Sequence, residues 1–430
     1  MSMWPFVKLG SLADFKNGLN FSSENFGRGV KVIGVTDFQD YFYPRYDEVK
    51  EINPNGIVRD VDYLEDEDVL FVRSNGNPNL IGRSLFIKKL PEKMSHSGFT
   101  IRLRFKSDKI FPPFYVYLFK SSLIRAVLSI YGGGTNINNL NQKILGNLDV
   151  PKPELATQKK IAAILSAYDE LIENNQRRIV LLEKLAEEIY REWFVRLRFP
   201  GHDKVNVAKG VPAGWSMSKL SEIYTTTSGG TPSRTKPEYY NGTIPWVKTG
   251  ELQNRFILST EESITSAGLE NSSAKTFPAK TILVAMYGAT IGQVGILGIE
   301  AATNQACCAL LPKHAYLGYS FSFHLMKSLK DWFVAVSFGG AQQNISQDVI
   351  RRCEVLLPPQ AVVENFCTVV DPMLSSIEAL ARQTELLANC RDKLLPRLIS
   401  GKLSVENLDI QFPPGMAEEL NAEPSATANA

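Results

Sequence analysis

The sequence of 430 residues lacks several features that would define a function by themselves. Its four histidines and five cysteines have neither metal-ligand nor disulfide-framework spacing, which excludes a metal centre or a cross-linked scaffold of the usual kinds. No uncharged apolar run approaches about 18 residues, and the N-terminus lacks a signal-peptide pattern, so we predict a cytoplasmic protein. The net charge of +2 gives no strong indication of a partner.

Catalytic motifs are also missing. No GxxxxGK[ST] phosphate-binding loop occurs. An amino-methyltransferase would need Asn or Asp before Pro-Pro-Tyr/Phe, whereas Pro112-Pro113-Phe114 follows the apolar Phe111. The histidines are too scattered for a catalytic triad or a metal site, and Cys307, Cys308, Cys353, Cys367 and Cys390 are expected to pack in cores. We therefore predict no catalytic and no metal-binding residues.

What the sequence does contain is a tandem repeat. The stretch at 138–189 reappears 205 residues later at 343–395, and Asn139, Val150 and Leu182 align with Asn344, Val355 and Leu387 without a gap. Such a repeat indicates two copies of one structural unit, which suits a target with two parts.

The repeat divides the chain into modules and helices. The segments ahead of the repeated stretches are rich in Gly, Asn, Thr and aromatic residues, as in α/β modules. They align at FVKLGSLADFKNG (6–18) with SMSKLSEIYTTTSG (216–229), at 32–38 with 243–249, and at the buried-strand pattern of 68–76 with 281–288. The predicted boundaries are module one at 1–155, a helical region at 156–200, module two at 201–357, a helical region at 358–402 and a disordered tail at 403–430.

Both repeated stretches carry an apolar seam with heptad spacing. Packing is easiest if the second helix runs antiparallel to the first, although a seam does not reveal whether its partner lies in the same chain. Asn175 either fixes the register or is half exposed. Caps are expected at Ser166 and at Asp371-Pro372, and the second helix should stop near Pro396 to Gly401. The predicted pairing residues are Tyr168, Ile172, Asn175, Ile179, Leu182, Ile189, Met373, Ile377, Leu380, Leu387 and Leu394.

Three segments carry a resemblance that extends over roughly residues 5–400. TSGGTPSRTKPEYYNGTIPWVKTGEL (227–252), GTNINNLNQKILGNLDVPKP (134–153) and QKKIAAILSAYDELIENNQRRIVLLEKLAEEIYREWF (158–194) resemble the specificity subunit of type I restriction-modification systems. The order of two modules, each followed by a helical region, is similar to that family. The first module departs from the pattern at SNGNPNLIGR (74–83), where the second has YGATIGQ (287–293).

The resemblance implies a fold and a function. The fold class is α+β, with two α/β target-recognition domains separated by two long antiparallel coiled-coil helices in a pseudo-two-fold tandem repeat. Each domain would read half of a bipartite site in double-stranded DNA. The helices would set the spacer and dock two methyltransferase subunits, and restriction subunits would join the complex. S-adenosylmethionine, ATP and Mg²⁺ are expected only in the partner subunits. The alternative is a degenerate or antirestriction scaffold that binds the partners without reading sequence.

Candidate DNA-contacting residues follow from side-chain chemistry. Arg, Lys, Asn and Gln read base edges, whereas Ser and Thr hold phosphates, and such residues are expected on Gly-rich turns. Gly229, Gly230, Thr231 and Pro232 are expected to be structural, and Trp246 to lie in a core. The candidates are Lys16, Asn17, Arg73, Asn75, Asn77 and Arg83 in module one, and Ser233, Arg234, Lys236, Lys248, Gln342 and Gln343 in module two.

Overall fold

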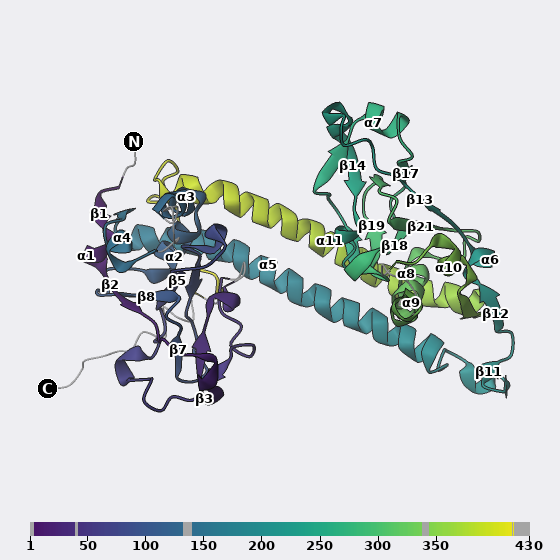
Figure 1. Ribbon diagram of the computed structural model, residues 1–430, viewed down its shortest axis with the longest axis horizontal. Helices are drawn as coiled ribbons and strands as arrows, with labels where there is room; N and C mark the ends of the chain where they lie inside the picture. The colour runs from purple at the N-terminus through teal and green to yellow at the C-terminus, as the bar shows by residue number, and fades with distance from the viewer. Residues whose placement is uncertain (1–3, 39–41, 132–139, 338–343, 415, 417–430) are drawn as a thin grey trace. The chain divides into compact units, whose positions relative to one another are not determined.

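The computed structural model describes residues 4–38, 42–131, 140–337, 344–414 and 416 (Figure 1). The chain divides into two compact units, here called unit 1 (residues 1–173 with 386–430) and unit 2 (residues 174–385). Each unit contains one module together with a part of each long helix. Over the described ranges, no helix is long and apolar enough to cross a membrane.

Unit 1 contains the first module, which is built on two small sheets. The larger sheet has the order β2-β8-β5-β6, the smaller has the order β4-β3-β7, and β1 pairs with β9. The central strand β5, with sequence VLFV, is buried at every position, as expected for an apolar β-branched run covered on both faces. The strands are Phe6–Lys8 (β1), Ala13–Asn17 (β2), Phe26–Ile33 (β3), Glu51–Ile52 (β4), Val69–Val72 (β5), Ser84–Phe86 (β6), Met94–His96 (β7), Thr100–Phe105 (β8) and Asp149–Pro151 (β9). The helices of the module are Leu9–Leu12 (α1), Pro112–Lys120 (α2), Ser122–Tyr131 (α3) and Gln142–Gly146 (α4).

Unit 2 contains the second module. Its larger sheet has the order β13-β21-β18-β19-β15, its second sheet has the order β16-β14-β20-β17, and β12 pairs with β22. The strands of these three sheets are Ser216–Lys219 (β12), Tyr224–Ser228 (β13), Tyr240–Val247 (β14), Arg255–Ile257 (β15), Glu262–Ile264 (β16), Lys275–Phe277 (β17), Ile282–Ala285 (β18), Val294–Leu297 (β19), Ala301–Thr303 (β20), Cys307–Pro312 (β21) and Glu354–Leu357 (β22). A short hairpin, Val207–Ala208 (β10) with Val211–Pro212 (β11), precedes them. The helices are Leu220–Ile223 (α6), Ser266–Glu270 (α7), Tyr319–Ser328 (α8), Lys330–Ser337 (α9) and Gln347–Arg352 (α10).

The strand registers confirm the tandem repeat. Phe6 lies opposite Pro151 in the first module, and Met217 lies opposite Leu356 in the second. The step from Pro151 to Leu356 is the 205-residue offset of the repeat (356 − 151), and Phe6 and Met217 lie in the aligned segments 6–18 and 216–229. The N-cap residue of α4, Asn141, accepts a hydrogen bond from the backbone N–H three residues on, and Ser346, 205 residues later, does the same for α10. The two modules therefore fold the same way down to single caps.

One predicted alignment is wrong by three residues. Ile33 pairs with His96 between β3 and β7, and Val247 pairs with Thr303 between β14 and β20, so 32–38 corresponds to 246–252. The connection between β13 and β14 (229–239) is three residues longer than that between β2 and β3 (18–25), which an alignment at the offset of the first strands does not take into account. Both β3 and β14 contain a register shift, at matching positions. The second module also has β15 and β17, for which the described part of the first module has no counterpart.

The long helices are Leu155–Tyr190 (α5), continued by a π-helical turn at Arg191–Val195, and Gln360–Ile399 (α11). Both predicted caps are wrong because each helix runs through them without a break. Ser166 lies inside α5, where its hydroxyl donates to the carbonyl oxygen of Ala163. Pro372 is exposed inside α11 next to the buried Leu374 and Ile377, so core packing there offsets the loss of one backbone hydrogen bond. The predicted end of α11 near Pro396 to Gly401 is confirmed.

The two helices pack antiparallel within one chain. In unit 2, Asn175 donates to Gln383 at 3.1 Å, while further along α5 the ring of Tyr190 lies 5.9 Å from that of Phe366. In unit 1, Arg391 of α11 pairs with Asp169 of α5 at 2.5 Å. Asn175 is only 5% exposed, so its register-fixing alternative is favoured.

The predicted pairing residues are distributed along this helix pair. Ile179, Leu182, Ile189, Met373 and Ile377 pack into the main core of unit 2, and Leu394 packs against the core of unit 1. Leu380 is buried, whereas Tyr168, Ile172 and Leu387 are half-buried.

Two minor predictions need correction. The tail prediction is wrong for residues 403–414, because Leu403, Val405 and Ile410 pack in or against the core of unit 1. Residues 415 and 417–430 lie outside the described residues. Four cysteines are buried as expected, but Cys390 is exposed.

Candidate nucleic-acid interface

A glycine turn follows the corresponding strand in each module, β2 in the first and β13 in the second. A Cβ atom on Gly18, just after β2, would lie 2.3 Å from the carbonyl oxygens of His96 and Ser97. A Cβ atom on Gly229, just after β13, would lie 1.9 Å from the carbonyl oxygen of Thr303. Gly230 is similarly restricted by Ser273 at 1.9 Å, which confirms that these glycines are structural. The polar loops that follow are thereby anchored to β7 and β20.

Arg234 is the most constrained candidate in the second module. Its guanidinium donates to both carboxylate oxygens of Glu262, at 2.6 and 3.2 Å. The guanidinium carbon also lies 4.4 Å from the ring centroid of Tyr240 and 5.3 Å from that of Trp246. Trp246 is 2% exposed, which confirms its core assignment, while the Arg234 side chain is 55% exposed. The loop thus presents a cation on a fixed aromatic base.

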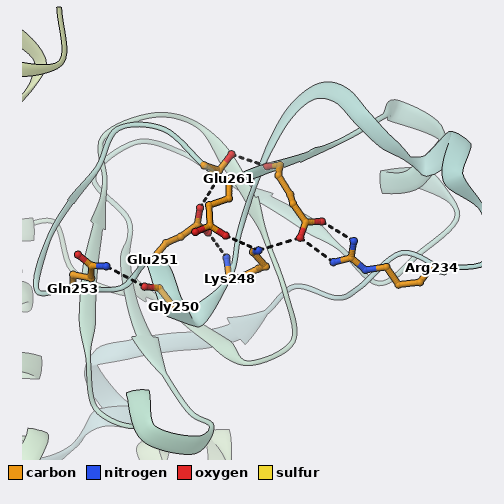
Figure 2. Close-up of polar contacts among 8 residues, drawn as sticks. Arg234, Lys248, Gly250, Glu251, Gln253 and Glu261 are labelled. Atoms are coloured by element: carbon orange, nitrogen blue, oxygen red, sulfur yellow. Dashed lines mark hydrogen bonds and ion pairs between the residues drawn. The ribbon is translucent and has the colours of Figure 1, made fainter. Parts of the chain in front are cut away.

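Lys248 follows β14 and lies in a cluster of acidic residues (Figure 2). Its ammonium nitrogen is 2.9 Å from a carboxylate oxygen of Glu261 and 3.0 Å from one of Glu262. Glu251, in the short 3₁₀ helix Thr249–Glu251, accepts hydrogen bonds from the backbone N–H groups of Lys248 at 2.6 Å and Glu261 at 2.8 Å. Lys248 and Arg234 are therefore connected through Glu262.

The ion pairs shift the titration of these groups. The hydrogen bond from Arg234, followed by that from Lys248, lowers the pKa of Glu262 below its usual range. Glu262 in turn raises the pKa of Arg234, and Glu261 and Glu262 raise the pKa of Lys248. All three groups consequently stay charged at neutral pH.

The remaining candidates of the second module are less constrained. Ser233 is exposed and shares a 2.8 Å hydrogen bond with the hydroxyl of Thr235. Lys236 is exposed and donates to the Tyr239 hydroxyl at 2.9 Å. Ser233, Arg234 and Lys236 thus share one loop, whereas Gln342 and Gln343 lie outside the described residues.

In the first module, Lys16 on β2 pairs with Asp62 at 2.6 Å, and Arg59 pairs with the same carboxylate at 3.0 Å. Burial acts to raise the pKa of Asp62, but the hydrogen bonds from Arg59 and Lys16 outweigh it and hold that pKa well below its usual range. Asn17, the next residue, is exposed at the end of β2. Lys16 is therefore committed to a carboxylate, while Asn17 faces solvent.

The other four candidates lie in the connection between β5 and β6. Arg73 donates to the carbonyl oxygen of Gly98 at 3.2 Å. The side-chain oxygen of Asn75 accepts from the N–H of Asn77, and that of Asn77 accepts from the N–H two residues on, so both shape the turn. Arg83 is half-buried directly before β6. Gly98 also donates to the carbonyl oxygen of Leu19, which brings Arg73 close to the turn after Asn17.

The two modules place opposite charges at matching positions. Ile52 pairs with Phe26 and Val30 across the shift in β3, as Ile264 pairs with Tyr240 and Ile244 across the shift in β14. Counting two residues back from Ile52 and Ile264 gives Lys50 in the first module and Glu262 in the second. The Lys50 ammonium lies 5.8 Å from the ring of Phe26, which corresponds to Tyr240. A cation therefore lies over the same ring position in each module but comes from a different segment.

Sequence reasoning missed the residues that hold the candidates in place: Asp62, Tyr240, Glu261 and Glu262. Glu262 follows Arg234 by 28 residues and Lys248 by 14, so no local spacing connects them. The adjacent Glu261-Glu262 pair at the start of a short strand was a weak signal that could have been noted.

Within the described ranges, no group of three or more His, Cys, Asp or Glu side chains could hold a metal ion. Burial lowers the pKa of His96 to about 3 and that of His324 to about 4, so both are neutral core residues near pH 7.

Comparison with known proteins gives matches along most of the chain. A family model described as the type I restriction modification DNA specificity domain matches residues 1–184 and again residues 212–379. The type I restriction enzyme MjaIX specificity subunit of Methanocaldococcus jannaschii is 26% identical over 309 residues, which cover 70% of this chain and 71% of that protein. The type I restriction enzyme HindI specificity subunit of Haemophilus influenzae is 25% identical over 325 residues, or 60% and 70% of the respective chains.

A solved structure extends the similarity to the fold. The crystal structure of the type I restriction-modification system S subunit from M. genitalium matches with a TM-score of 0.62. The match covers 93% of this chain and 96% of that chain at 16% identity. At this level of identity the similarity concerns the fold.

Proposed function

The chain belongs to the type I restriction modification DNA specificity family, and on that premise we propose that it is the DNA sequence-recognition subunit of a type I restriction-modification complex. Its two modules bind the two halves of a bipartite site in double-stranded DNA, one half per module. The paired helices α5 and α11 set the spacer between the halves.

A single observation carries this proposal: the family model matches twice, and both matches fall on the same strand topology with the same registers. Polar side chains differ between the modules where the scaffold agrees, as Lys50 and Glu262 illustrate. Two equal scaffolds with unequal polar surfaces suit two different half-sites better than one repeated ligand. The two relatives described above, both specificity subunits by name, support the same function.

Catalysis is assigned to partner subunits in this proposal. Two methyltransferase subunits and the restriction subunits dock on this chain, and they supply the sites for S-adenosylmethionine, ATP and Mg²⁺. The only Pro-Pro-Phe segment supports this division, because it lies at the start of α2 with Phe114 buried and the apolar Phe111 ahead of it. The complex acts in the cytoplasm of a prokaryote.

The test is methylation mapping by single-molecule sequencing of DNA from cells that express this chain with its cognate methyltransferase subunit. Cells that express the methyltransferase subunit alone are the control. The expected result is methyladenine in a split motif that appears only when this chain is present.

A complex that forms without any chain-dependent motif would contradict the proposal. That outcome would favour the degenerate or antirestriction scaffold, which binds partners without reading DNA sequence.

A further inference from the structure

The loop of Arg234 is attached to the two aromatic rings beneath the guanidinium. The Trp246 indole N–H donates to the carbonyl oxygen of Gly230 at 3.1 Å, and the Tyr240 hydroxyl donates to that of Pro232 at 2.5 Å. Arg234 stacks on both rings. An arginine held in this way loses little further conformational freedom when it binds a planar partner.

Glu262 fixes the guanidinium from a second direction. It lies opposite Trp246 in the pairing of β14 with β16, so the sheet register places its carboxylate beside the same rings. It occupies one N–H on each terminal nitrogen of Arg234. A guanidinium has five N–H donors, so three are left for a ligand on a side chain that is 55% exposed.

The charge of the cluster argues against a phosphate as that ligand. Arg234 and Lys248 contribute two positive charges, and Glu251, Glu261 and Glu262 contribute three negative ones. Glu261 is 74% exposed, so an approaching phosphate would meet an uncovered carboxylate (Figure 2). A base edge is neutral and offers paired acceptors, and guanine O6 and N7 match the arginine fork best.

We propose that Arg234 reads a guanine in the half-site of the second module, through two hydrogen bonds to O6 and N7, and that Glu262 is the residue that positions it. This inference rests on the proposed function and adds to it a reading residue and a base. Lys248 donates to both Glu262 and Glu261 and so helps to hold the Glu262 carboxylate in place.

The experiment uses the full chain in complex with its methyltransferase subunit. Initial methylation rates are measured on a duplex with the mapped motif and on duplexes with each single substitution in the second half-site. The variants are Arg234→Lys, which keeps the charge without the fork, and Glu262→Gln, which keeps the shape without the charge. Lys236→Ala is the matched control, since Lys236 is an exposed cation of the same loop.

For Arg234→Lys we expect the preference for guanine at one position to fall about 10- to 100-fold while the first half-site stays fully specific. Glu262→Gln should relax the same position by a smaller factor. Lys236→Ala should lower all rates by a common factor, as the loss of a phosphate contact would.

Three results would overturn the inference. Full discrimination at every position by Arg234→Lys would remove Arg234 as a reader, and relaxation at a base pair other than G·C would remove guanine. A uniform rate loss in Glu262→Gln, without relaxation, would leave Glu262 a merely structural residue. Failure of the wild-type complex to methylate any split motif would instead contradict the proposed function, so the two failures are distinguishable.

Discussion

The strand β3 in the first module and β14 in the second have the same pairing, the same register shift and a parallel neighbour at the same position. Yet one presents Phe26 under Lys50, and the other presents Tyr240 under Arg234, with Glu262 beside it. Backbone hydrogen bonds specify the strands in both modules, while the exposed side chains are free to differ. The comparison teaches that recognition chemistry can change without cost to the scaffold.

The connection between the third and fourth strands in the order of each larger sheet, β5 to β6 and β18 to β19, shows the same division. Residues 74–83 and 287–293 differ in length and composition, but in each an Ile-Gly pair precedes the last residue, with the glycine in the left-handed region at φ +70° for Gly82 and +74° for Gly292. A Cβ on Gly82 would lie 2.9 Å from Leu128, and one on Gly292 would lie 3.1 Å from Lys330. Packing therefore fixes the C-terminal end of each loop, and the differences in length and composition lie ahead of it.

The units differ most in how their helices are held, and the largest predicted effect tests that difference. Phe366 is fully buried in unit 2 against the rings of Tyr190, Phe194 and Phe321. We expect Phe366→Ala to lower the free energy of unfolding of unit 2 by about 3–5 kcal/mol. The change is measured by urea unfolding. Brief hydrogen-exchange labelling, read out in peptides from each unit, follows the unfolding of unit 1 and unit 2 separately. Val369→Ala, at an exposed position of the same helix, is the control and should have little effect.

Unit 1 adds polar contacts to the apolar packing of its helix pair. Asp169 accepts from Arg391 at 2.5 Å and from the Tyr117 hydroxyl at 2.6 Å. Arg391→Met leaves Asp169 one partner, and we expect a loss of roughly 1–3 kcal/mol in unit 1, measured in the same way. A loss in unit 1 as large as that of Phe366→Ala in unit 2 would mean that the polar contact stabilises its helix pair as much as the aromatic cluster does.

A third prediction tests the claim that the scaffolds are equivalent. Gly18→Ala and Gly229→Ala each place a Cβ against fixed backbone carbonyl groups, so each should destabilise its own unit by about 1–3 kcal/mol. Gly27→Ala and Gly250→Ala are matched controls, because a Cβ at either position meets nothing within 4 Å. The measurement is the urea midpoint of each unit. Tolerance of one substitution but not the other would show that the turns have diverged.

These equivalences show which parts of the structure the sequence could predict. The repeat at an offset of 205 residues and the buried strands at 69–72 and 282–285 depend on local patterns, and the structure reproduces them. The caps at Ser166 and Asp371 were also local patterns, but burial of the neighbouring Leu165 and Leu374 continues both helices through them. The position of the Arg234 guanidinium depends on Glu262, 28 residues away in sequence, and only the folded sheet brings the two residues together.

A smaller effect should separate the modules by pH. His96 is 1% exposed at the end of β7, where the second module has Thr303, and burial lowers its pKa to about 3. The positive charges of Arg102 and Lys16 contribute to this lowering, and Asp62 opposes it. Between about pH 6.5 and 3 the unfolded chain binds a proton that the folded module does not. The free energy of unfolding of unit 1 should therefore decrease by about 1.4 kcal/mol for each unit by which the pH is lowered within this range.

His96→Gln removes the titrating group and should flatten this dependence between pH 6.5 and 5.5. The readout is again the urea midpoint of unit 1 peptides at the two pH values. Unit 2 is an internal reference, since the variant should leave its own dependence, to which His324 contributes, unchanged. An equally steep fall in the variant would assign the acid sensitivity of unit 1 to carboxylates instead.

The smallest predicted change in stability concerns the cation over Phe26. Lys50 is exposed and lies 5.8 Å from that ring, so Lys50→Gln should cost unit 1 no more than about 1 kcal/mol. If the exposed faces of β3 and β14 read separate half-sites, Lys50→Gln should relax the methylation motif only in the half-site of the first module. That is the half-site that should stay specific in Arg234→Lys. Methylation mapping of the two variants side by side measures this. Relaxation of the same base pair by both would mean that the two faces do not read separate halves, however similar their backbones are.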